Sequence, residues 1–309
     1  MILFNMIPKT KQSLDNSFCG FITIIGKPNV GKSTLLNKLI GKKISITTNK
    51  PQTTRHKILG IKTINNKQAI YVDTPGMCFK NYSKVIQLMN KAAKSSLKDA
   101  DVILFVIESM RWDSKDEEVL QQIQKFKQKT PVFLILNKID LISDHNLLLP
   151  EIQKLTEKYN FTEVFPISAN KNINLDILEK KIFNNLPVAP HYFLNTVTDQ
   201  NLNFRASEII REKLIKNLSQ ELPYVLNVEI TNITKQQSIN KIDAVIWVEK
   251  SGQKKIVIGE NGSKLKLIGT QARLDLEKLF NKKVFLTLWV QIKPDWTNNA
   301  NNLKQLNII

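Results

Sequence analysis

Cysteine is scarce in this sequence, and no apolar run is long. The 309 residues contain only Cys19 and Cys78, too few for a framework of disulfides, which indicates a reducing, cytoplasmic compartment. The apolar opening, Met1 to Pro8, is far shorter than the roughly 20 residues that span a bilayer, and it lacks the layout of a secretory signal. The three histidines are scattered without the spacing of zinc ligands. These absences argue against a disulfide-stapled secreted domain, an integral membrane protein and a zinc enzyme.

Arginine is also rare, although the chain is strongly basic. The formal net charge is +18, yet arginine occurs at only five positions, so almost all of the positive charge is lysine. An excess of this size predicts a polyanionic partner, either nucleic acid or an anionic membrane surface. Asparagine and isoleucine are abundant too, so nucleotide bias in the gene is an alternative source of part of the lysine, which would then form a solvated surface.

Strand-like and helix-like segments alternate from Phe21 to about Asn185. Apolar runs predict strands at Phe21 to Ile25, Ile58 to Ile64, Gln68 to Val72, Val102 to Ile107, Val132 to Leu136 and Val164 to Ile167. Apolar residues at three- and four-residue steps predict helices at Leu35 to Ile40, Lys84 to Lys98, Asp116 to Lys127, Leu147 to Tyr159 and Leu175 to Asn184. The alternation predicts a mostly parallel α/β sheet with helices on both faces and ligand loops at the strand carboxyl ends.

The segment between the first predicted strand and helix has the pattern G-x-x-x-x-G-K-S. It reads Gly26, Lys27, Pro28, Asn29, Val30, Gly31, Lys32, Ser33, Thr34. In such a phosphate loop the glycines turn backbone N–H groups toward the phosphates, Lys32 spans the outer phosphates, and the Ser33 hydroxyl can ligate Mg²⁺. An ordinary Gly-Pro turn is the alternative. The strand before the segment and the helix after it favour a nucleoside triphosphate site.

The base that this loop serves is indicated by two later segments. Asn137, Lys138, Ile139 and Asp140 follow a buried-looking strand, and a carboxylate at Asp140 can accept from the ring N–H and exocyclic amine of guanine, groups that adenine lacks. A polar strand-to-helix turn is the alternative, but its place after a phosphate loop favours guanine. Ser168 and Ala169, in the loop after the sixth predicted strand, are then candidates to contact the guanine carbonyl.

Two further segments supply candidate Mg²⁺ ligands. The predicted strand Gln68 to Val72 is followed directly by Asp73, Thr74, Pro75, Gly76 and Met77. Asp73 can hold a Mg²⁺-bound water and the Gly76 N–H can contact a terminal phosphate. Thr53 and Thr54, in the segment Pro51 to His56, are predicted to form a switch, and Thr54 would complete a metal shell that begins with Ser33.

This set of segments resembles the translation-factor-related branch of small GTPases, which are of the same general type as Ras. The resemblance implies GTP and GDP as ligands with Mg²⁺. Ras-like proteins carry glutamine after the D-x-x-G glycine to orient the attacking water, whereas this chain has Met77, so we expect slow intrinsic turnover. In related GTPases with an apolar residue there, an asparagine placed like Asn29 helps to bind K⁺. That role is a hypothesis here, and an asparagine that only stabilises the loop is the alternative.

A second domain is predicted after the proline-rich segment Leu186 to Pro190. A helix is expected at Arg205 to Ser219, strands at Tyr224 to Ile230 and Asp243 to Glu249, helices near Ser263 to Ile268 and Thr270 to Leu279, and a last strand at Val284 to Val290. The order is α-β-β-α-α-β. Gly259, Glu260, Asn261 and Gly262 form a G-x-x-G loop at the first helix of the pair, the position at which a KH domain clamps single-stranded RNA.

A G-x-x-G sequence alone is more often an ordinary turn, but lysines surround this one. Lys264 and Lys266 follow the loop and Lys254 and Lys255 precede it. Val257 and the apolar strand residues are expected to form the floor of a groove for unstacked bases.

The whole pattern resembles the Era family, bacterial GTPases with a carboxy-terminal KH domain of the second type. The resemblance covers about Phe18 to Leu306, and its most specific parts are the phosphate loop, Gln52 to His56, Asp73 to Gly76, Asn137 to Asp140, and Arg205 to Lys213 with Glu221 to Tyr224. It implies binding near the 3′ end of small-subunit ribosomal RNA, assistance in assembling the small ribosomal subunit, and some peripheral association with the inner membrane.

The resulting domain plan has five parts. We expect an N-terminal extension over residues 1–17, with Met6 as an alternative start, a GTPase domain over 18–186, a linker over 187–202, a KH domain over 203–293 and a tail over 294–309. The sequence has neither a coiled-coil pattern nor a long apolar face, so we expect a monomer.

Two features depart from what the resemblance implies, and one segment has two interpretations. Glu260 places an acid inside the clamp loop, where it should weaken phosphate binding modestly, and the tail is rich in asparagine. Glu208, Arg211 and Glu212 either form a charged interface with the GTPase domain or lie on a solvated helix face.

Three functions remain open from the sequence. The first is an assembly GTPase whose nucleotide state switches RNA binding. The second is an RNA chaperone in which hydrolysis is incidental, and the third is a membrane-associated regulatory GTPase.

Overall fold

The computed structural model describes residues 17–51, 53–77, 84–126, 130–219, 222, 225–297 and 299. It divides into two compact units that do not follow the linear order of the chain. The first contains the described residues of 1–43, 57–77 and 93–199, and the second those of 44–56, 78–92 and 200–309. The expected N-terminal extension lies outside the described residues except for Ser17, as do Gln52, Cys78, Glu221 and most of the tail.

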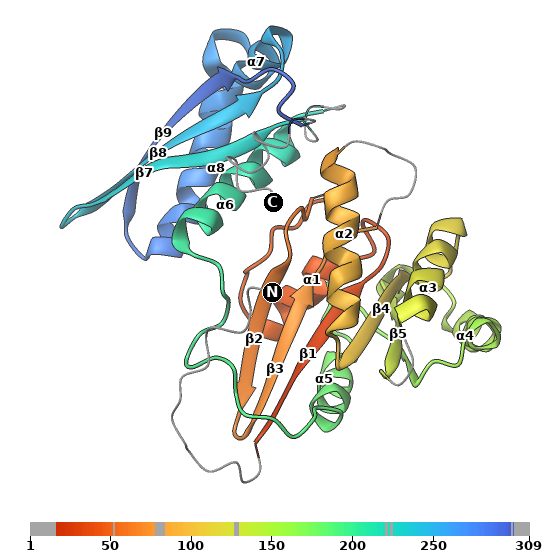
Figure 1. The fold of residues 1–309 in the computed structure, drawn as a ribbon. Helices are drawn as coiled ribbons and strands as arrows, with labels where there is room; N and C mark the ends of the chain where they lie inside the picture. The colour runs from red at the N-terminus through yellow and green to blue at the C-terminus, as the bar shows by residue number, and fades with distance from the viewer. Residues whose placement is uncertain are drawn as a thin grey trace. The chain divides into compact units, whose positions relative to one another are not determined.

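The first unit is built on a six-stranded sheet of order β2-β3-β1-β4-β5-β6. β2 runs antiparallel to β3 and the other neighbours are parallel, which confirms the predicted mostly parallel sheet (Figure 1). The strands are β1 (Phe18–Ile25), β2 (Ile58–Ile64), β3 (Lys67–Asp73), β4 (Val102–Glu108), β5 (Val132–Asn137) and β6 (Glu163–Pro166). All residues of β5 are buried and only Glu108 of β4 is not, as expected for central parallel strands covered on both faces.

Five helices connect these strands. They are α1 (Lys32–Ile40), α2 (Lys84–Lys98), α3 (Ser114–Phe126), α4 (Leu148–Lys158) and α5 (Leu175–Asn184). The sequence periodicity predicted the bounds of α2 and α5 and placed the others within three residues. The βα alternation brings the carboxyl ends of β1, β3, β4 and β5 to one edge of the sheet, where most of the predicted nucleotide-binding segments begin.

The residues expected to form a linker pack on this sheet. Gln68 of β3 accepts hydrogen bonds from the Tyr192 and Phe193 backbone N–H groups at 2.9 and 3.0 Å, and the Ile61 N–H donates to the Val197 carbonyl at 2.9 Å. The Phe193 side chain packs against the cluster that contains Ile70. Residues 188–199 therefore belong to the first unit.

The C-terminal part of the second unit has the predicted order α-β-β-α-α-β. Its elements are α6 (Leu202–Asn217), β7 (Asn227–Lys235), β8 (Ile239–Val248), α7 (Ser251–Ile258), α8 (Ser263–Phe280) and β9 (Lys283–Ile292). β7 is antiparallel to β8, and β8 is parallel to β9. The core lies between the sheet and helices α6 and α8, where Leu214, Ile246 and Ile268 are fully buried.

The predicted helix pair was wrong in detail. We expected helices on both sides of Gly269, but α8 runs through it from Ser263 to Phe280, and the first helix of the pair is α7 before the loop. Gly269 does not break the helix because α8 packs on β9 there: an added Cβ would lie at an ordinary 3.5 Å from Leu288. Helix α7 ends in the β-branched run Ile256 to Ile258, where burial of Val257 in the core outweighs the weak helix preference of these residues.

Candidate functional site

The phosphate loop is shaped by close contacts at its two glycines. A Cβ at Gly26 would lie 2.2 Å from the Val106 carbonyl oxygen, and one at Gly31 would lie 2.3 Å from Asn137 Nδ2. Gly31 also has a φ of 101°, which other residues rarely adopt. Only glycine fits either position, so the loop is held in one shape by the strands behind it.

Lys32 is buried inside this loop. Its Nζ donates to the carbonyl oxygens of Gly26 at 3.0 Å and Lys27 at 2.7 Å. Burial lowers the pKa of Lys32 to about 8, although Asp73 and Asp116 raise it. The ammonium is thus poorly compensated by the protein, and a phosphate group is the kind of partner that would stabilise its charge.

The two predicted Mg²⁺ ligands of the first unit are brought together. The Ser33 hydroxyl donates to Asp73 Oδ2 at 2.6 Å, and Asp73 is fully buried at the end of β3. A hydroxyl and a carboxylate are oxygen ligands of the type that Mg²⁺ prefers, so these residues fit the metal. Thr54, the third expected ligand, belongs to the second unit.

The D-x-x-G segment lies against the phosphate loop. A Cβ at Gly76 would lie 2.8 Å from Pro28 Cα, and the Met77 N–H donates to the Gly26 carbonyl at 3.4 Å. Thr74 Oγ1 donates to the Ile24 carbonyl at 2.8 Å. Met77 is 1% exposed, so an apolar, buried side chain follows the D-x-x-G glycine.

The segments predicted to bind guanine are joined through Asn137. Its Nδ2 donates to the Val30 carbonyl at 2.7 Å, and its Oδ1 accepts from the Ala169 N–H at 3.0 Å. Ser168 donates from Oγ to Asp140 Oδ1 at 2.5 Å, which orients the carboxylate. One amide thus links the phosphate loop to the loop after β6.

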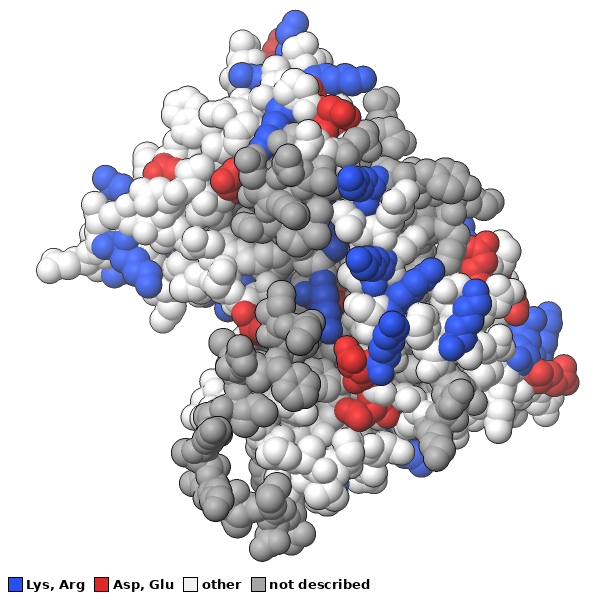
Figure 2. Space-filling model, in the orientation of Figure 1, with Lys and Arg blue, Asp and Glu red and all other residues white. Residues whose placement is uncertain are grey.

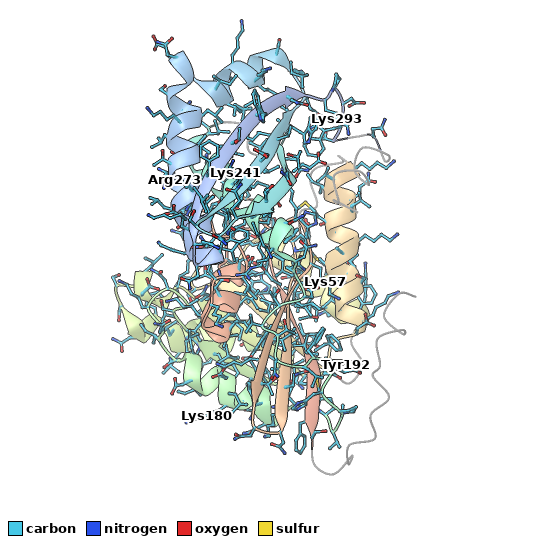
Figure 3. The ribbon with its side chains drawn as sticks, turned by 90° about the vertical axis from the view of Figure 1, so that its left-hand side faces the viewer. Lys57, Lys180, Tyr192, Lys241, Arg273 and Lys293 are labelled. Carbon is cyan, nitrogen blue, oxygen red and sulfur yellow. The ribbon has the colours of Figure 1, made fainter. Side chains whose placement is uncertain are left out.

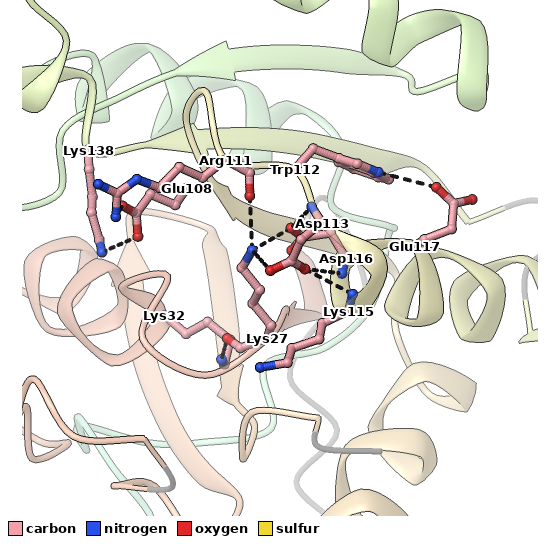
Figure 4. A network of polar contacts seen from close by, with 10 residues as sticks. All are labelled: Lys27, Lys32, Glu108, Arg111, Trp112, Asp113, Lys115, Asp116, Glu117 and Lys138. Atoms are coloured by element: carbon pink, nitrogen blue, oxygen red, sulfur yellow. Dashed lines mark hydrogen bonds and ion pairs between the residues drawn. The ribbon is translucent and has the colours of Figure 1, made fainter. Parts of the chain in front are cut away.

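A charged network around Lys27 was not predicted from the sequence (Figure 4). Lys27 Nζ donates to Asp116 Oδ2 at 2.6 Å and to the Arg111 carbonyl at 3.0 Å, and it forms an ion pair with Asp113 at 3.0 Å. Burial lowers the pKa of Lys27, but the two carboxylates raise it by more, so the pKa lies above its ordinary value. Burial raises the pKa of Asp116, which is 0% exposed, and Lys27 opposes that shift. The amine of Lys27 therefore ties the phosphate loop to the start of α3.

A second pair joins the loop after β5 to β4. Lys138 Nζ forms an ion pair with Glu108 Oε2 at 2.6 Å, and Arg111 pairs with Glu108 Oε1 at 2.7 Å (Figure 4). Lys138 has a left-handed φ of 68°. Acids and bases near the strand ends are the only sequence signal for these two networks, because most of the partners lie far apart along the chain.

The predicted switch segment is anchored on α6. The Arg211 guanidinium, 1% exposed, donates from Nη2 to the Thr53 carbonyl at 2.5 Å. It also binds both carboxylate oxygens of Glu208, at 2.6 and 2.7 Å. Burial alone would raise the pKa of Glu208, but the charge and hydrogen bonds of Arg211 lower it. The solvated-face interpretation of this helix is wrong, since Glu208, Arg211 and Glu212 are all buried.

Two more residues of the switch segment contact the C-terminal part of the second unit. Arg55 donates from Nη1 to the Leu226 carbonyl at 2.8 Å, and the His56 ring meets Phe204 edge-on at 5.1 Å. Burial, with the charges of Arg211 and Arg55, lowers the pKa of His56 to about 4 despite the nearby Glu208. The neutral imidazole is therefore the form that packs here near neutral pH.

The G-x-x-G loop lies between α7 and α8. Gly259 and Gly262 both have a φ of 75° and Asn261 one of 47°, so three of its four residues have positive φ angles. Glu260, Asn261 and Lys266 are exposed, and Lys264 is half-buried. The loop is accessible to solvent, which a phosphate clamp requires.

An open groove of about 410 Å³ continues from this loop. Its lining comes from α8 and β9 and consists of Gly262, Leu265, Lys266, Gly269, Thr270, Arg273, Leu286 and Leu288. Arg273, which Figure 3 labels, lies at this groove and pairs with Glu277 at 3.0 Å. Val257 was expected at the groove floor but is 0% exposed inside the core. Leu286 and Leu288 supply apolar lining instead.

The start of the expected tail is buried in a small separate cluster of the second unit. Trp296 is 0% exposed and packs with Val85 and Met89 of α2. Its Nε1 donates to the Val225 carbonyl at 3.2 Å. At least this part of residues 294–309 is structural.

The fold and site define a GTPase of the phosphate-loop class followed by a KH domain. A family model described as 50S ribosome-binding GTPase matches residues 21–138, and a KH domain model matches residues 221–297. The chain is 49% identical over 291 residues to GTPase Era of Coxiella burnetii (strain Dugway 5J108-111), a match that covers 94% of this chain and 98% of that relative. GTPase Era of Vibrio vulnificus (strain YJ016) is 46% identical over 304 residues, 97% of this chain and 94% of the relative.

Solved structures give the same result. Era in complex with MgGDPNP and nucleotides 1506–1542 of 16S ribosomal RNA matches with a TM-score of 0.91 and 39% identity, covering 95% of this chain and 99% of that one. A variant of Aquifex aeolicus Era bound to GDP·AlF4⁻ matches with a TM-score of 0.90 and 39% identity, covering 94% of this chain and 99% of that one. The chain belongs to the Era family and is a GTPase. Within the described residues, every helix is too short or too polar to cross a membrane.

Proposed function

We propose that this protein hydrolyses GTP with Mg²⁺, binds the 3′ region of small-subunit ribosomal RNA and assists assembly of the small ribosomal subunit. The RNA-bound Era structure, solved with MgGDPNP and nucleotides 1506–1542 of 16S ribosomal RNA, supports this proposal. The nucleotide segments of the first unit and the accessible G-x-x-G loop of the second provide the two activities. The protein acts as a monomer in the cytoplasm, with some peripheral association with the inner membrane.

Five residues have direct roles at the nucleotide. Lys32 contacts the outer phosphates, Ser33 ligates Mg²⁺, Asp73 holds a metal-bound water, Thr54 completes the shell and Asp140 binds guanine. The buried Lys32 and the Ser33–Asp73 hydrogen bond support these roles. Mg²⁺, when bound, neutralises charge that develops on the phosphates during hydrolysis.

Met77 gives hydrolysis a slow intrinsic rate, because its buried thioether cannot orient the attacking water. Asn29, which has a left-handed φ of 67° in the phosphate loop, is the candidate ligand for K⁺, whose charge would assist at the phosphates. GTP turnover should therefore be faster in K⁺ than in Na⁺ buffer. Equal turnover in the two buffers would exclude this role.

The nucleotide state switches RNA binding through the segment that contains Thr53. The observation that carries this proposal is the hydrogen bond from Arg211 of α6 to the Thr53 carbonyl. A γ-phosphate and its metal order such segments in GTPases, and hydrolysis releases them. Rearrangement of Thr53 would break a charge-assisted bond to the first helix of the KH domain.

The coupling is tested with Arg211→Lys, which keeps the charge and removes the forked donor. We expect wild type to bind the RNA with different affinities in GTP analogue and in GDP, and this ratio to approach one in Arg211→Lys. Arg205→Lys, a half-buried arginine of the same helix, is the matched control and should keep the wild-type ratio. A ratio of one in wild type would contradict the switch. Single-turnover hydrolysis that RNA does not stimulate would favour the chaperone alternative.

A further inference from the structure

Helix α2 carries four lysines and no carboxylate in its 15 residues. Lys84, Lys91 and Lys98 are exposed and lie seven positions apart, or about two helical turns, so they share one face of the helix. Lys94, half-buried, lies between the last two. Figure 2 shows blue lysine side chains gathered over this helix. We call these four residues the α2 lysine face.

Repulsion among the lysines of the α2 lysine face destabilises the helix, and the helix has no acid that would offset it. Lys91 and Lys94 are three positions apart and Lys94 and Lys98 four, and like charges at these spacings destabilise a helix. Lys98 lies over the Phe126 ring at 5.9 Å. Among the described residues, none of the four forms an ion pair with a carboxylate. The charge therefore remains available to an anionic partner.

The lysine-rich composition of the chain does not account for this face. Helix α1 also has two lysines and no acid, but one of them is the buried Lys32. Helices α3, α4 and α5, which also connect strands of the first unit, mix both signs of charge: α3 has three acids and two lysines, α4 has two of each, and α5 has two of each. A general bias toward lysine should have affected all four helices alike. Among these four helices, only α2 concentrates positive charge without acids.

The remaining residues of α2 indicate the chemistry of the partner. The apolar side of the helix is already buried, with Val85, Ile86, Met89, Ala93 and Leu97 each at most 6% exposed. A helix that binds in a membrane interface needs an apolar face to insert among the lipids, and that face of α2 is already used in packing. The lysine ammonium groups, at steps of about 10 Å along the helix, suit the separate phosphates of a nucleic-acid backbone.

We infer that the α2 lysine face binds the sugar-phosphate backbone of RNA, as a contact additional to the G-x-x-G clamp. This inference rests on the proposed RNA binding. The contact is electrostatic and independent of sequence, so it adds affinity and salt dependence without adding base specificity. It also engages the helix that follows Asp73 to Met77 in the chain.

The test compares two triple variants of the full chain. K84Q/K91Q/K98Q removes three charges from the α2 lysine face, and K125Q/K154Q/K180Q removes three from exposed positions of α3, α4 and α5; Figure 3 labels Lys180. Affinity for an RNA of nucleotides 1506–1542 of 16S ribosomal RNA, the segment in the solved Era complex, is measured over a series of salt concentrations. Each lost phosphate contact should lower the slope of log K against log salt by about 0.7–0.9.

We expect the α2 variant to lose about 2 in slope, with the control variant unchanged. A single-stranded RNA of about four nucleotides, the length that a KH loop clamps, should bind wild type and the α2 variant alike. Thermal melts identify any variant that fails to fold, and the single variant K91Q then serves with an expected slope change of about 0.7–0.9.

Three results would overturn the inference. Equal slope changes in the two triple variants would mean that the lysines act through net charge alone. Loss of binding to vesicles containing anionic lipid, with the RNA slope kept, would assign the face to a membrane. Unchanged RNA and vesicle binding would leave the face without a polyanion partner. If wild type does not bind the RNA at all, the proposed function fails, and this result is distinct from the other three.

Discussion

The chain has two glycine-containing loops that are proposed to bind phosphates, and they are built in different ways. In the phosphate loop, an added Cβ at Gly26 or Gly31 would lie within 2.3 Å of Val106 or Asn137, which are distant in sequence. In the G-x-x-G loop, a Cβ at Gly259 would meet only Lys264, five positions on, and one at Gly262 would meet no described atom within 4 Å. At Gly262 the φ of 75° alone requires glycine. The first loop is held by tertiary packing and the second by local backbone conformation, so substitutions should affect the first more strongly.

The largest expected effect comes from comparing alanine at the two loops. Gly31→Ala combines a left-handed φ with overpacking against Asn137, at a cost of roughly 2–5 kcal/mol in stability. We expect the affinity of this variant for GTP to fall by more than about 100-fold. Gly262→Ala carries only the conformational cost of about 1–2 kcal/mol and should weaken RNA binding without affecting GTP. Nucleotide titration, RNA titration and thermal melts measure these effects, and equal losses of stability in the two variants would contradict the difference between the loops.

The contact of Asp116 with Lys27 supports the phosphate loop from α3, and a substitution can remove it. Asp116→Asn removes the buried charge that holds Lys27, while Asp113 remains as a half-exposed partner. We expect a loss of about 1–3 kcal/mol in stability and about a tenfold weaker affinity for GTP. Glu117→Gln, next to it on α3 and bonded to Trp112 rather than Lys27, is the control. An Asp116→Asn variant with wild-type affinity would show that the tie is dispensable.

The same contrast explains what the sequence could predict. Local patterns predicted the sheet, its helices and the segments at the strand ends, because those depend on short-range periodicity and on residue types that phosphate chemistry requires. They could not predict the Lys27 and Arg211 networks, whose partners are far apart in sequence and are selected by packing. Gly269 and Val257 were misassigned for a related reason: tertiary burial, rather than propensity, decides the structure of α7 and α8.

Both the stability of the nucleotide-free protein and its affinity for GTP should depend on pH through Lys32. Because burial lowers its pKa to about 8 from the ordinary value of 10.5, the unfolded chain binds more protons than the folded one between those values. The stability of the nucleotide-free protein should accordingly gain a contribution as pH rises from about 8 toward 10.5. GTP affinity should change in the opposite direction, falling above about pH 8 as the ammonium loses its proton.

Calorimetric titration from about pH 7 to about pH 9.5 measures this fall, which should approach about tenfold for each pH unit beyond the pKa if the phosphates require the charged form. Lys32→Arg stays protonated over this range, so it should bind more weakly and without that dependence. A wild-type affinity that stays flat over the whole range would mean that Lys32 remains charged in the empty site, contrary to its burial.

Substitution of Glu260, in the G-x-x-G loop, should change RNA affinity only slightly. Glu260 is exposed in a loop whose other three residues have positive φ angles. Its charge acts through solvent, so Glu260→Lys should raise RNA affinity only about three- to tenfold at low salt, and less as salt increases. Glu260→Gln should give about half of that change in free energy, because it removes a charge without adding one. An unchanged affinity at low salt would mean that the side chain lies away from the RNA and that backbone N–H groups alone make the clamp. A change of more than about 100-fold would instead show that the clamp depends on one side chain, as the phosphate loop is proposed to depend on Lys32, and the difference between the two loops would be lost.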